Sequence, residues 1–221
     1  MSERAAAAKQ APGDEDRGRR TTPRSARGMR TRAALIDAAR VVFERDGYLD
    51  ARMTDISAAA GVAAGSVYTY FTNKEEIFSV VAEQVQEEML HPRLRQRTGI
   101  TDPRRLIDLA HREYLRSYKK NARLMGLFEQ VAQIDQTFRK LRIERTHAFA
   151  KRNATMIREL QQAGLADTTL DPLITAQALS SMVSRMAYTT FVLEFPIPFE
   201  RLVTTLNQIW INALQLEATA G

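Results

Sequence analysis

The segment from Met53 to Lys74 constrains the fold of this chain most, because it places a sharp corner between two short helical patterns. It reads MTDISAAAGVAAGSVYTYFTNK. Thr54 is placed to cap the first helix, since its hydroxyl can accept a hydrogen bond from an unpaired backbone N–H. Gly61 can take the left-handed conformation that ends a helix. The segment therefore predicts a helix, a tight turn and a second helix.

The second helix opens with residues 63–66, which read Ala-Ala-Gly-Ser and have almost no side-chain bulk. Val67 and Phe71 follow four residues apart and are predicted to face inward. In helix-turn-helix units, a helix of this kind enters the major groove of DNA and touches base edges with its first residues. An ordinary helical hairpin with glycine at its corner also fits the segment, because short motifs occur by chance.

Two flanking patterns favour the DNA-binding interpretation. Upstream, residues 31–46 have apolar side chains at helical spacing, and Gly47 is predicted to end that helix. Downstream, Asn73 and Glu76 form a capping-box-like pair that begins another helix. Lys74 lies in its first turn, where the helix dipole disfavours a cation. A contact with a DNA phosphate would explain this lysine, and a solvated lysine is the alternative.

The region from about Thr31 to Phe78 resembles the N-terminal domain of the TetR (tetracycline-repressor-like) family of transcriptional regulators. One departure is Ala63, where the family often has a serine or threonine cap. The resemblance rests on the following residues: Ala38-Ala39, Phe43, Gly47-Tyr48, Thr54, Ile56, Ala59-Ala60-Gly61-Val62, Gly65-Ser66-Val67-Tyr68, Tyr70-Phe71 and Asn73-Lys74-Glu75-Glu76-Ile77-Phe78.

This resemblance implies a sequence-specific DNA-binding regulator, most often a repressor, that a small-molecule effector releases from its operator. Two alternatives stay open: a constitutive DNA-binding dimer without an effector, and a helical hydrophobe-binding protein that no longer binds DNA. We expect Arg30, Arg32, Thr54 and Lys74 to position phosphates. We expect the reading helix to contact bases or backbone through Ala64, Gly65, Ser66, Tyr68, Thr69 and Tyr70.

The positive charge of the chain is concentrated at its N-terminus. The net charge is +6, and residues 1–32 carry nine basic and four acidic side chains, so five of the six charges lie there. Residues 1–27 have no sustained apolar period and are predicted to form a disordered basic arm. Such an arm can follow phosphates or enter a minor groove. A solubilising tail without a function is an equal alternative.

After Phe71 the chain reads as helical throughout, without a period-two run or hairpin signal. The fold class is therefore all-α, with about nine helices. We predict three parts: the arm (1–27), a three-helix helix-turn-helix domain (28–72) and a larger helical bundle for effector binding and dimerisation (73–221). The helices expected after Phe71 span 73–97, with a kink at His91-Pro92, and then 103–118, 121–134, 136–163, 172–194 and 199–215.

The last two long helices have more apolar residues than one buried face needs. In the TetR family the corresponding helices pair with those of a second copy. A homodimer also has a physical rationale, since two linked helix-turn-helix domains reach successive major grooves about 34–36 Å apart. The residues expected at this interface are Val183, Phe191, Leu206, Trp210 and Leu214.

Aromatic and methionine side chains in the bundle are most simply core, but such residues also line adaptable apolar pockets. By resemblance, an apolar or amphipathic effector would bind there. The pocket residues expected are Phe78, Tyr114, Tyr118, Met125, Phe128, Met156 and Met182, with polar contacts from Gln130 and Gln133. Residues 138–158 are also rich in arginine and lysine. This is either a solvated face or a site for an anionic ligand tail, such as the phosphates of an acyl-coenzyme A.

Nothing in the sequence indicates catalysis. Cysteine is absent, and the three histidines lack the spacing of metal ligands. There is no phosphate-binding glycine loop and no nucleophile elbow. We therefore expect no catalytic residue, metal or cofactor. Apolar runs are shorter than the roughly 20 residues that span a bilayer, so no membrane partner and a cytoplasmic location are expected.

Overall fold

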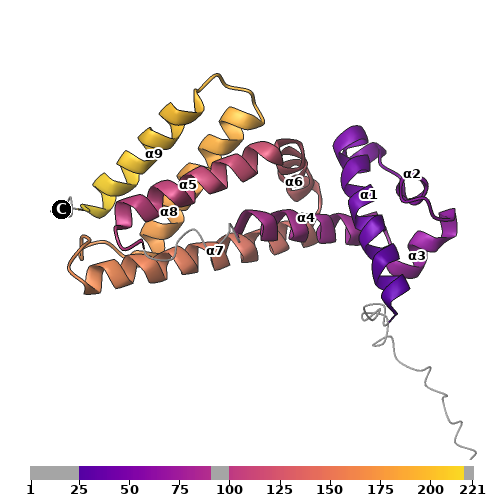
Figure 1. Ribbon diagram of the computed structural model, residues 1–221, viewed down its shortest axis with the longest axis horizontal. Helices are drawn as coiled ribbons and strands as arrows, with labels where there is room; N and C mark the ends of the chain where they lie inside the picture. Colours follow the sequence, from indigo (N-terminus) through magenta and orange to yellow (C-terminus); the bar gives the residue numbers. More distant parts are fainter. Residues whose placement is uncertain (1–24, 91–99, 217–221) are drawn as a thin grey trace, which may run out of the picture.

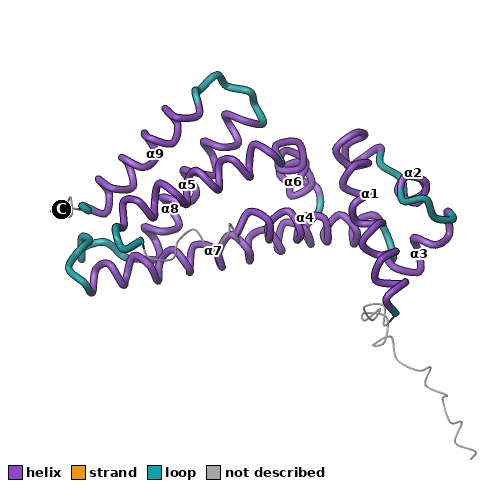
Figure 2. Tube along the Cα trace, in the orientation of Figure 1, coloured by secondary structure: helices purple, strands orange, loops and turns teal. Residues whose placement is uncertain are grey.

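A computed structural model describes residues 25–90 and 100–216, which contain nine α-helices, one 3₁₀ turn (η2) and no strand (Figures 1 and 2). The all-α prediction is therefore confirmed. The elements are α1 (Ala26–Asp50), α2 (Met53–Ala59), η2 (Ala64–Ser66), α3 (Val67–Tyr70), α4 (Lys74–Leu90), α5 (Pro103–Lys120), α6 (Ala122–Ile134), α7 (Gln136–Gln162), α8 (Pro172–Phe191) and α9 (Phe199–Leu214).

The elements form an elongated molecule with a small unit at one end (Figure 1). We call α1, α2, η2 and α3 the reader, and α5 to α9 the bundle. Helix α4 leaves the reader and runs beside α7, while α6 packs against α1. Within the bundle, α8 packs on α7 and α5, and α9 packs on α5. The division into an arm and two domains at residues 27 and 72 stays a prediction.

Several helix boundaries follow local capping signals. Asp102 Oδ1 accepts a hydrogen bond from Arg104 N at 2.9 Å, and Pro103 occupies the first turn of α5, as predicted. Asp171 caps α8 in the same way, with Pro172 in its first turn. Gly164 follows α7 with φ of 69°, a left-handed conformation that suits a residue without a Cβ.

Two boundaries in the reader differ from the prediction. Helix α1 begins at Ala26 and is capped by Ser25, so it starts inside the segment predicted to be a disordered arm. The remainder of that arm, residues 1–24, lies outside the described residues, as does the His91-Pro92 kink. Helix α2 begins at Met53, which makes Arg52 the cap residue and places Thr54 in the first turn. The predicted capping role of Thr54 is therefore wrong, because the helix starts two residues earlier than a cap at Thr54 would place it.

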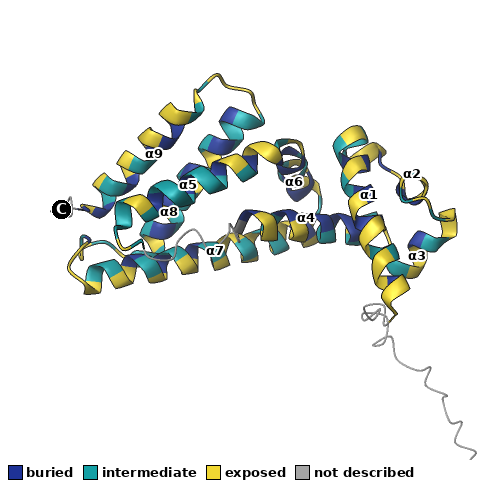
Figure 3. Ribbon diagram, in the orientation of Figure 1, coloured by how far each residue is buried: buried dark blue, intermediate teal, exposed yellow. Residues whose placement is uncertain are grey.

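One buried core connects the reader to the bundle (Figure 3). At its centre are five aromatic rings: Phe43 and Tyr48 from α1, Phe78 from α4, Phe128 from α6 and Phe138 from α7. The Phe43–Phe78 and Phe78–Phe128 ring centroids are 5.0 and 5.4 Å apart, with nearly perpendicular planes. Such edge-to-face contacts are favourable beyond the area that they bury. The reader thus packs directly onto α6, and Phe78 of α4 links this cluster to α7.

Helix α9 is held on α5 by a buried polar contact beside an aromatic one. Asn207 Nδ2 donates to Asp108 Oδ1 at 2.7 Å, which turns Asn207 Oδ1 toward His111 Nδ1, also at 2.7 Å. Burial lowers the pKa of His111, so the imidazole stays neutral and Nδ1 donates to Asn207. The Trp210 ring meets His111 edge-on at 5.2 Å. This face of α9 therefore belongs to the core of the single chain.

The residues expected at the dimer interface need correction for the same reason. Val183, Leu206, Trp210 and Leu214 are all buried within one chain, and Phe191 is half-buried against its core. A partner could not reach the four buried side chains without unfolding the bundle, whereas Phe191 stays a predicted interface residue. The hydrophobic spacing indicated correctly that each helix has a buried face, but not that the chain itself covers that face.

Candidate nucleic-acid interface

The turn that leads into α3 lies on the outside of the reader. Gly61 takes φ of 67°, as predicted, and Ser66 N donates to Ala63 O at 2.8 Å to close η2. Ala64 and Gly65 are exposed, and a Cβ at position 65 would meet no atom within 4 Å. Ala63 provides no side-chain cap. The predicted tip with little side-chain bulk is therefore open to a large partner.

The reader anchors this tip from behind. Val67 and Phe71 are fully buried, as the four-residue spacing predicted. Ser57, also buried, lies with its Oγ 3.0 Å from Met53 O and 3.2 Å from Ala64 O, so it ties α2 to the tip. The sequence pattern did not single out this serine. A buried hydroxyl with two carbonyls in reach holds the turn in one position.

The outward-facing residues are a subset of those predicted to contact DNA. Tyr68 is 49% exposed, and Thr69 and Thr54 are also exposed. Ser66 is half-buried, and Tyr70 packs partly against the reader core. Tyr70 is therefore at least partly structural. The exposed hydroxyls and methyl groups of this surface suit contacts with phosphates and base edges.

The two predicted arginines lie on α1. Arg30 is exposed, while the Arg32 guanidinium lies over the Phe71 ring, 5.1 Å from its centroid. A stacked guanidinium keeps its N–H groups available at its edge, so Arg32 can still reach a phosphate. Because Phe71 directly follows α3, this contact also places the cation beside the reading helix.

Lys74 has an internal role that the sequence did not reveal. Its Nζ donates to Tyr48 O at 2.7 Å and to Leu49 O at 3.0 Å, and it lies 4.8 Å from the centre of the Tyr48 ring. These carbonyls lie beyond the interruption of α1 at Gly47, where the backbone has φ of 80° and ψ of 177°. A cation near these terminal carbonyls satisfies groups that the helix leaves unpaired. The position of Lys74 no longer requires a phosphate contact, which stays a prediction.

A polar link that sequence analysis missed joins the reader to the bundle. Arg40 of α1 contacts Glu44 at 3.4 Å and Glu88 of α4 at 3.3 Å. Its Nη2 also donates to Asn121 Oδ1, and Asn121 lies buried between α5 and α6. Arg40 therefore connects α1 to α4 and to the α5–α6 corner.

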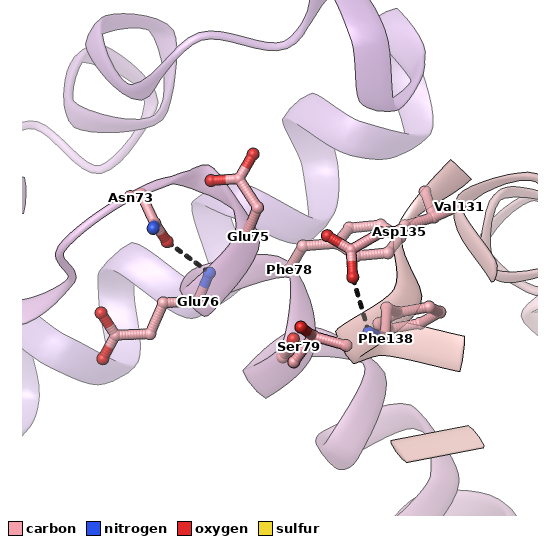
Figure 4. A pocket seen from close by; sticks show the side chains of 9 residues that line it. Asn73, Glu75, Glu76, Phe78, Ser79, Val131, Asp135 and Phe138 are labelled. Carbon is pink, nitrogen blue, oxygen red and sulfur yellow. Dashed lines mark hydrogen bonds between the residues drawn. The ribbon is translucent and has the colours of Figure 1, made fainter. Parts of the chain in front are cut away.

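The same junction contains a hollow of about 360 Å³ between α4 and the α6–α7 corner (Figure 4). Phe78, Val131 and Phe138 supply apolar lining, while Glu75, Glu76 and Asp135 make its rim acidic. Asn73 and Asp135 are occupied as helix caps, as their hydrogen bonds to Glu76 N (2.9 Å) and Phe138 N (2.6 Å) show. Of the predicted pocket residues, this hollow includes Phe78.

The residues predicted to form one effector pocket fall into two separate groups. Phe78 and Phe128 fill the aromatic core described above, whereas Tyr114 and Tyr118 lie with Phe149 of α7 and Phe191 of α8. Aromatic periodicity could not separate the groups, because both use helical spacing. Met125 is buried, and Met156 and Met182 are half-buried against the core; Gln130 and Gln133 are exposed, so they do not provide interior polar contacts.

Comparison with known proteins decides the family. Residues 35–81 match the bacterial regulatory proteins of the TetR family, and residues 107–215 match the C-terminal domain of the transcriptional regulator EthR. The chain belongs to the TetR family of transcriptional regulators. The HTH-type transcriptional regulator EthR of Mycobacterium tuberculosis is 25% identical over 208 residues, covering 90% of this chain and 92% of EthR. The HTH-type transcriptional repressor NicS of Pseudomonas putida is 31% identical over 85 residues, or 38% of this chain and 40% of NicS.

Solved structures of TetR-family proteins share the fold. SmeT, the repressor of a Stenotrophomonas maltophilia multidrug efflux pump, aligns with a TM-score of 0.69 at 20% identity, covering 85% of this chain and 91% of SmeT. The fatty acid degradation regulator FadR of Bacillus halodurans aligns with a TM-score of 0.70 at 22% identity, covering 85% of this chain and 97% of FadR.

TetR-family proteins are DNA-binding regulators of transcription and not enzymes, which agrees with the sequence analysis. Within residues 25–90 and 100–216, no group of three or more histidine, aspartate or glutamate side chains is arranged to hold a metal ion. No helix of this part of the chain is both long and apolar enough to cross a bilayer.

Proposed function

We propose that this TetR-family protein is a homodimeric repressor that binds a specific operator and leaves it when a small molecule enters the bundle. The observation that carries the first half is the tip of η2 and α3. It is exposed, almost free of side-chain bulk at Ala64 and Gly65, and anchored by buried Val67 and Phe71. Backbone without side chains can approach base pairs closely, while Tyr68 and Thr69 make the adjacent contacts.

A dimer through α8 and α9 has to use the faces that the bundle leaves uncovered. On α8 the exposed residues recur at helical spacing, and Ile174 at their start is 71% exposed. Ile209 of α9 is 39% exposed among polar neighbours. We propose these outward faces in place of the buried residues considered earlier. The α8 residues are Ile174, Ala178, Ser181 and Arg185, and the α9 residues are Thr205, Gln208, Ile209 and Asn212.

The second half of the proposal requires that ligand binding in the bundle moves the reader, and the contacts between α5 and α1 provide a route for this movement. Tyr118 is one turn from Asn121, which holds Arg40 of the reader. A ligand that moves this part of α5 therefore moves α1. The acyl-coenzyme A hypothesis receives less support, since Arg139, Arg142 and Arg145 of α7 already bond to protein oxygens. Lys140, Lys151, Arg152 and Arg158 are exposed, and a phosphate contact would have to use them.

The operator half is tested by substituting the outward side chains of α3. Tyr68→Ala with Thr69→Ala should weaken binding to DNA from around the protein's own gene about 10- to 100-fold, since base contacts carry about 1–3 kcal/mol each. Binding to random DNA should change little, because phosphate contacts dominate it. Fluorescence anisotropy at fixed salt measures both. Thr155→Ala, at an exposed threonine of α7 away from both the reader and the proposed dimer faces, is the control and should leave DNA affinity unchanged. Equal losses on both DNAs would contradict the assignment of α3 as the reading helix.

The effector half is tested by screening small molecules for release of that DNA. At least one apolar or amphipathic compound is expected to stabilise the protein thermally and lower its DNA affinity in the same concentration range. If compounds that stabilise the protein never change its DNA affinity, the protein is instead a constitutive DNA-binding dimer.

A further inference from the structure

The bundle contains a buried group of polar side chains that the fold itself does not satisfy. Tyr118 is fully buried, and its hydroxyl has no hydrogen-bond partner in the described part of the chain. Arg142 of α7 pairs with Glu129 of α6 at 2.6 Å through Nη2, while its Nη1 is buried without a partner. Leaving a buried donor unpaired costs its desolvation free energy, so each of these groups calls for a partner that the chain itself does not supply.

The side chains around these two donors contact one another: Tyr114 packs on both Tyr118 and Phe149, and Phe149 lies two turns along α7 from Arg142. Burial raises the pKa of the Tyr118 hydroxyl far above its usual value, with further contributions from Tyr114, Glu129 and Tyr188, while Arg142 acts to lower it. Burial also raises the pKa of Tyr114 to about 12, again with Glu129 and Arg142 near enough to influence it. At neutral pH both phenols therefore keep their protons, and Tyr118 can donate. The site lies among α5, α6, α7 and α8.

Aromatic side chains from three helices surround these groups. Tyr114 of α5 is half-buried between α7 and α8. Its ring lies 5.8 Å from that of Tyr118 and 6.4 Å from that of Phe149, while Phe191 lies 6.4 Å from Tyr118. Aromatic walls of this kind favour a flat apolar ligand body.

The charge balance of the site selects the polar group of the ligand. Arg142 is already neutralised by Glu129, and both tyrosines are neutral, so the site offers donors without a net charge. A carboxylate would add an uncompensated negative charge beside Glu129, and an ammonium group would oppose Arg142. Burying an unbalanced charge is far more costly than burying a neutral dipole.

We infer that this site, which is the effector site of the proposed function, binds an uncharged carbonyl compound with an aromatic or similarly flat apolar body. The carbonyl oxygen accepts hydrogen bonds from the Tyr118 hydroxyl and Arg142 Nη1. The rings of Tyr114, Phe149 and Phe191 surround the apolar body. Because Tyr118 lies one turn before Asn121, a ligand bound here also contacts the part of α5 that holds Arg40.

This inference is tested by comparing the affinities of three small molecules for the full-length wild-type protein and for two variants, all without DNA. Three probes share one ring system: methyl 2-naphthoate, 2-naphthoate and 2-methylnaphthalene. Titration calorimetry should show the ester binding wild type about tenfold more tightly than the hydrocarbon. Tyr118→Phe removes one hydroxyl and should abolish that tenfold preference, with no loss of thermal stability because an unpaired donor is removed. Tyr48→Phe, a tyrosine outside this site, is the matched control and should keep the preference.

Other results of the same titrations would contradict the inference. Tighter binding of 2-naphthoate than of the ester would overturn the inferred neutrality of the site. An unchanged ester preference in Tyr118→Phe, or no binding of any probe, would overturn the inference itself. Operator binding is measured separately, so a bundle that ignores all three probes while the reader still binds DNA leaves the DNA half of the proposed function intact.

Discussion

At the scale of single residues, the most instructive position is Lys74. A lysine in the first turn of a helix opposes the helix dipole, which made a phosphate contact an attractive explanation. Instead, its ammonium group bonds two carbonyls at the end of α1 and lies against the Tyr48 ring. Its contacts join α1 to α4, so the residue contributes to the stability of the reader whether or not DNA is present.

Lys74→Met should therefore lower the free energy of unfolding by about 1–2 kcal/mol, because a charge-assisted hydrogen bond and a cation–π contact are lost. Urea unfolding measures this change. Lys120→Met, at an exposed lysine of α5, is the control and should be nearly neutral. A Lys74→Met protein of wild-type stability that binds all DNA more weakly, with a flatter salt dependence, would show that phosphate contact is the main role.

At the scale of elements, two glycines of the reader have opposite requirements. Gly47 interrupts α1 with φ of 80° and ψ of 177°, a conformation that residues with a Cβ rarely adopt. Gly65 has no positive φ and faces open space. Gly47 is therefore suited to the backbone conformation of α1, and we propose that Gly65 is needed for the approach of DNA, although the sequence alone does not distinguish the two glycines.

Substitution of each glycine by alanine separates these requirements. Gly47→Ala should cost about 1–3 kcal/mol of stability because of backbone strain. Gly65→Ala should leave stability nearly unchanged yet weaken operator binding about tenfold, since the added methyl stands where bases approach. Thermal unfolding and fluorescence anisotropy on both variants provide the comparison. A destabilised Gly65→Ala protein, or one with full operator affinity, would argue against an outward tip at η2.

At the scale of the whole molecule, the main feature is that the reader packs against the bundle and is not a separate domain joined by a flexible linker. The ring cluster of Phe43, Phe78 and Phe128 spans α1, α4 and α6, and Arg40 reaches Asn121 beside it. Packed cores pass on small displacements because they have little free volume. In the proposed function, ligand binding in the bundle would therefore change the position of the reader, and a dimer would convert that change into the spacing of two readers.

The dimer is expected to have twice the chain mass in sedimentation experiments at micromolar concentration. Ile174→Asp should shift it toward the monomer, because the exposed end of α8 would then bring two charges together in the interface. Stability of the single chain should not suffer, since an acidic residue in the first turn of a helix is favourable. Ile143→Asp on α7, at a side chain that is 61% exposed, is the matched control. A protein that is monomeric before any substitution would contradict the proposed layout.

Local signals predicted much of this protein. The aspartate–proline pairs that begin α5 and α8, the positive-φ glycine at position 61 and the inward spacing of Val67 and Phe71 all act within a few residues. Short-range hydrogen bonding and sterics govern such features, so the sequence was enough for the all-helical class and the helix-turn-helix. It failed at the cap of α2 by two residues, because whether Met53 and Thr54 join the helix depends on neighbouring packing.

Tertiary structure alone decided which apolar faces meet. Leu206 and Trp210 have the spacing of either a core or an interface, and only the contact of α9 with α5 shows that they are core. Phe128 and Tyr118 likewise lie in different clusters despite similar patterns. Periodicity records that a helix face is buried but not against what, because that information lies in contacts between residues far apart in the chain.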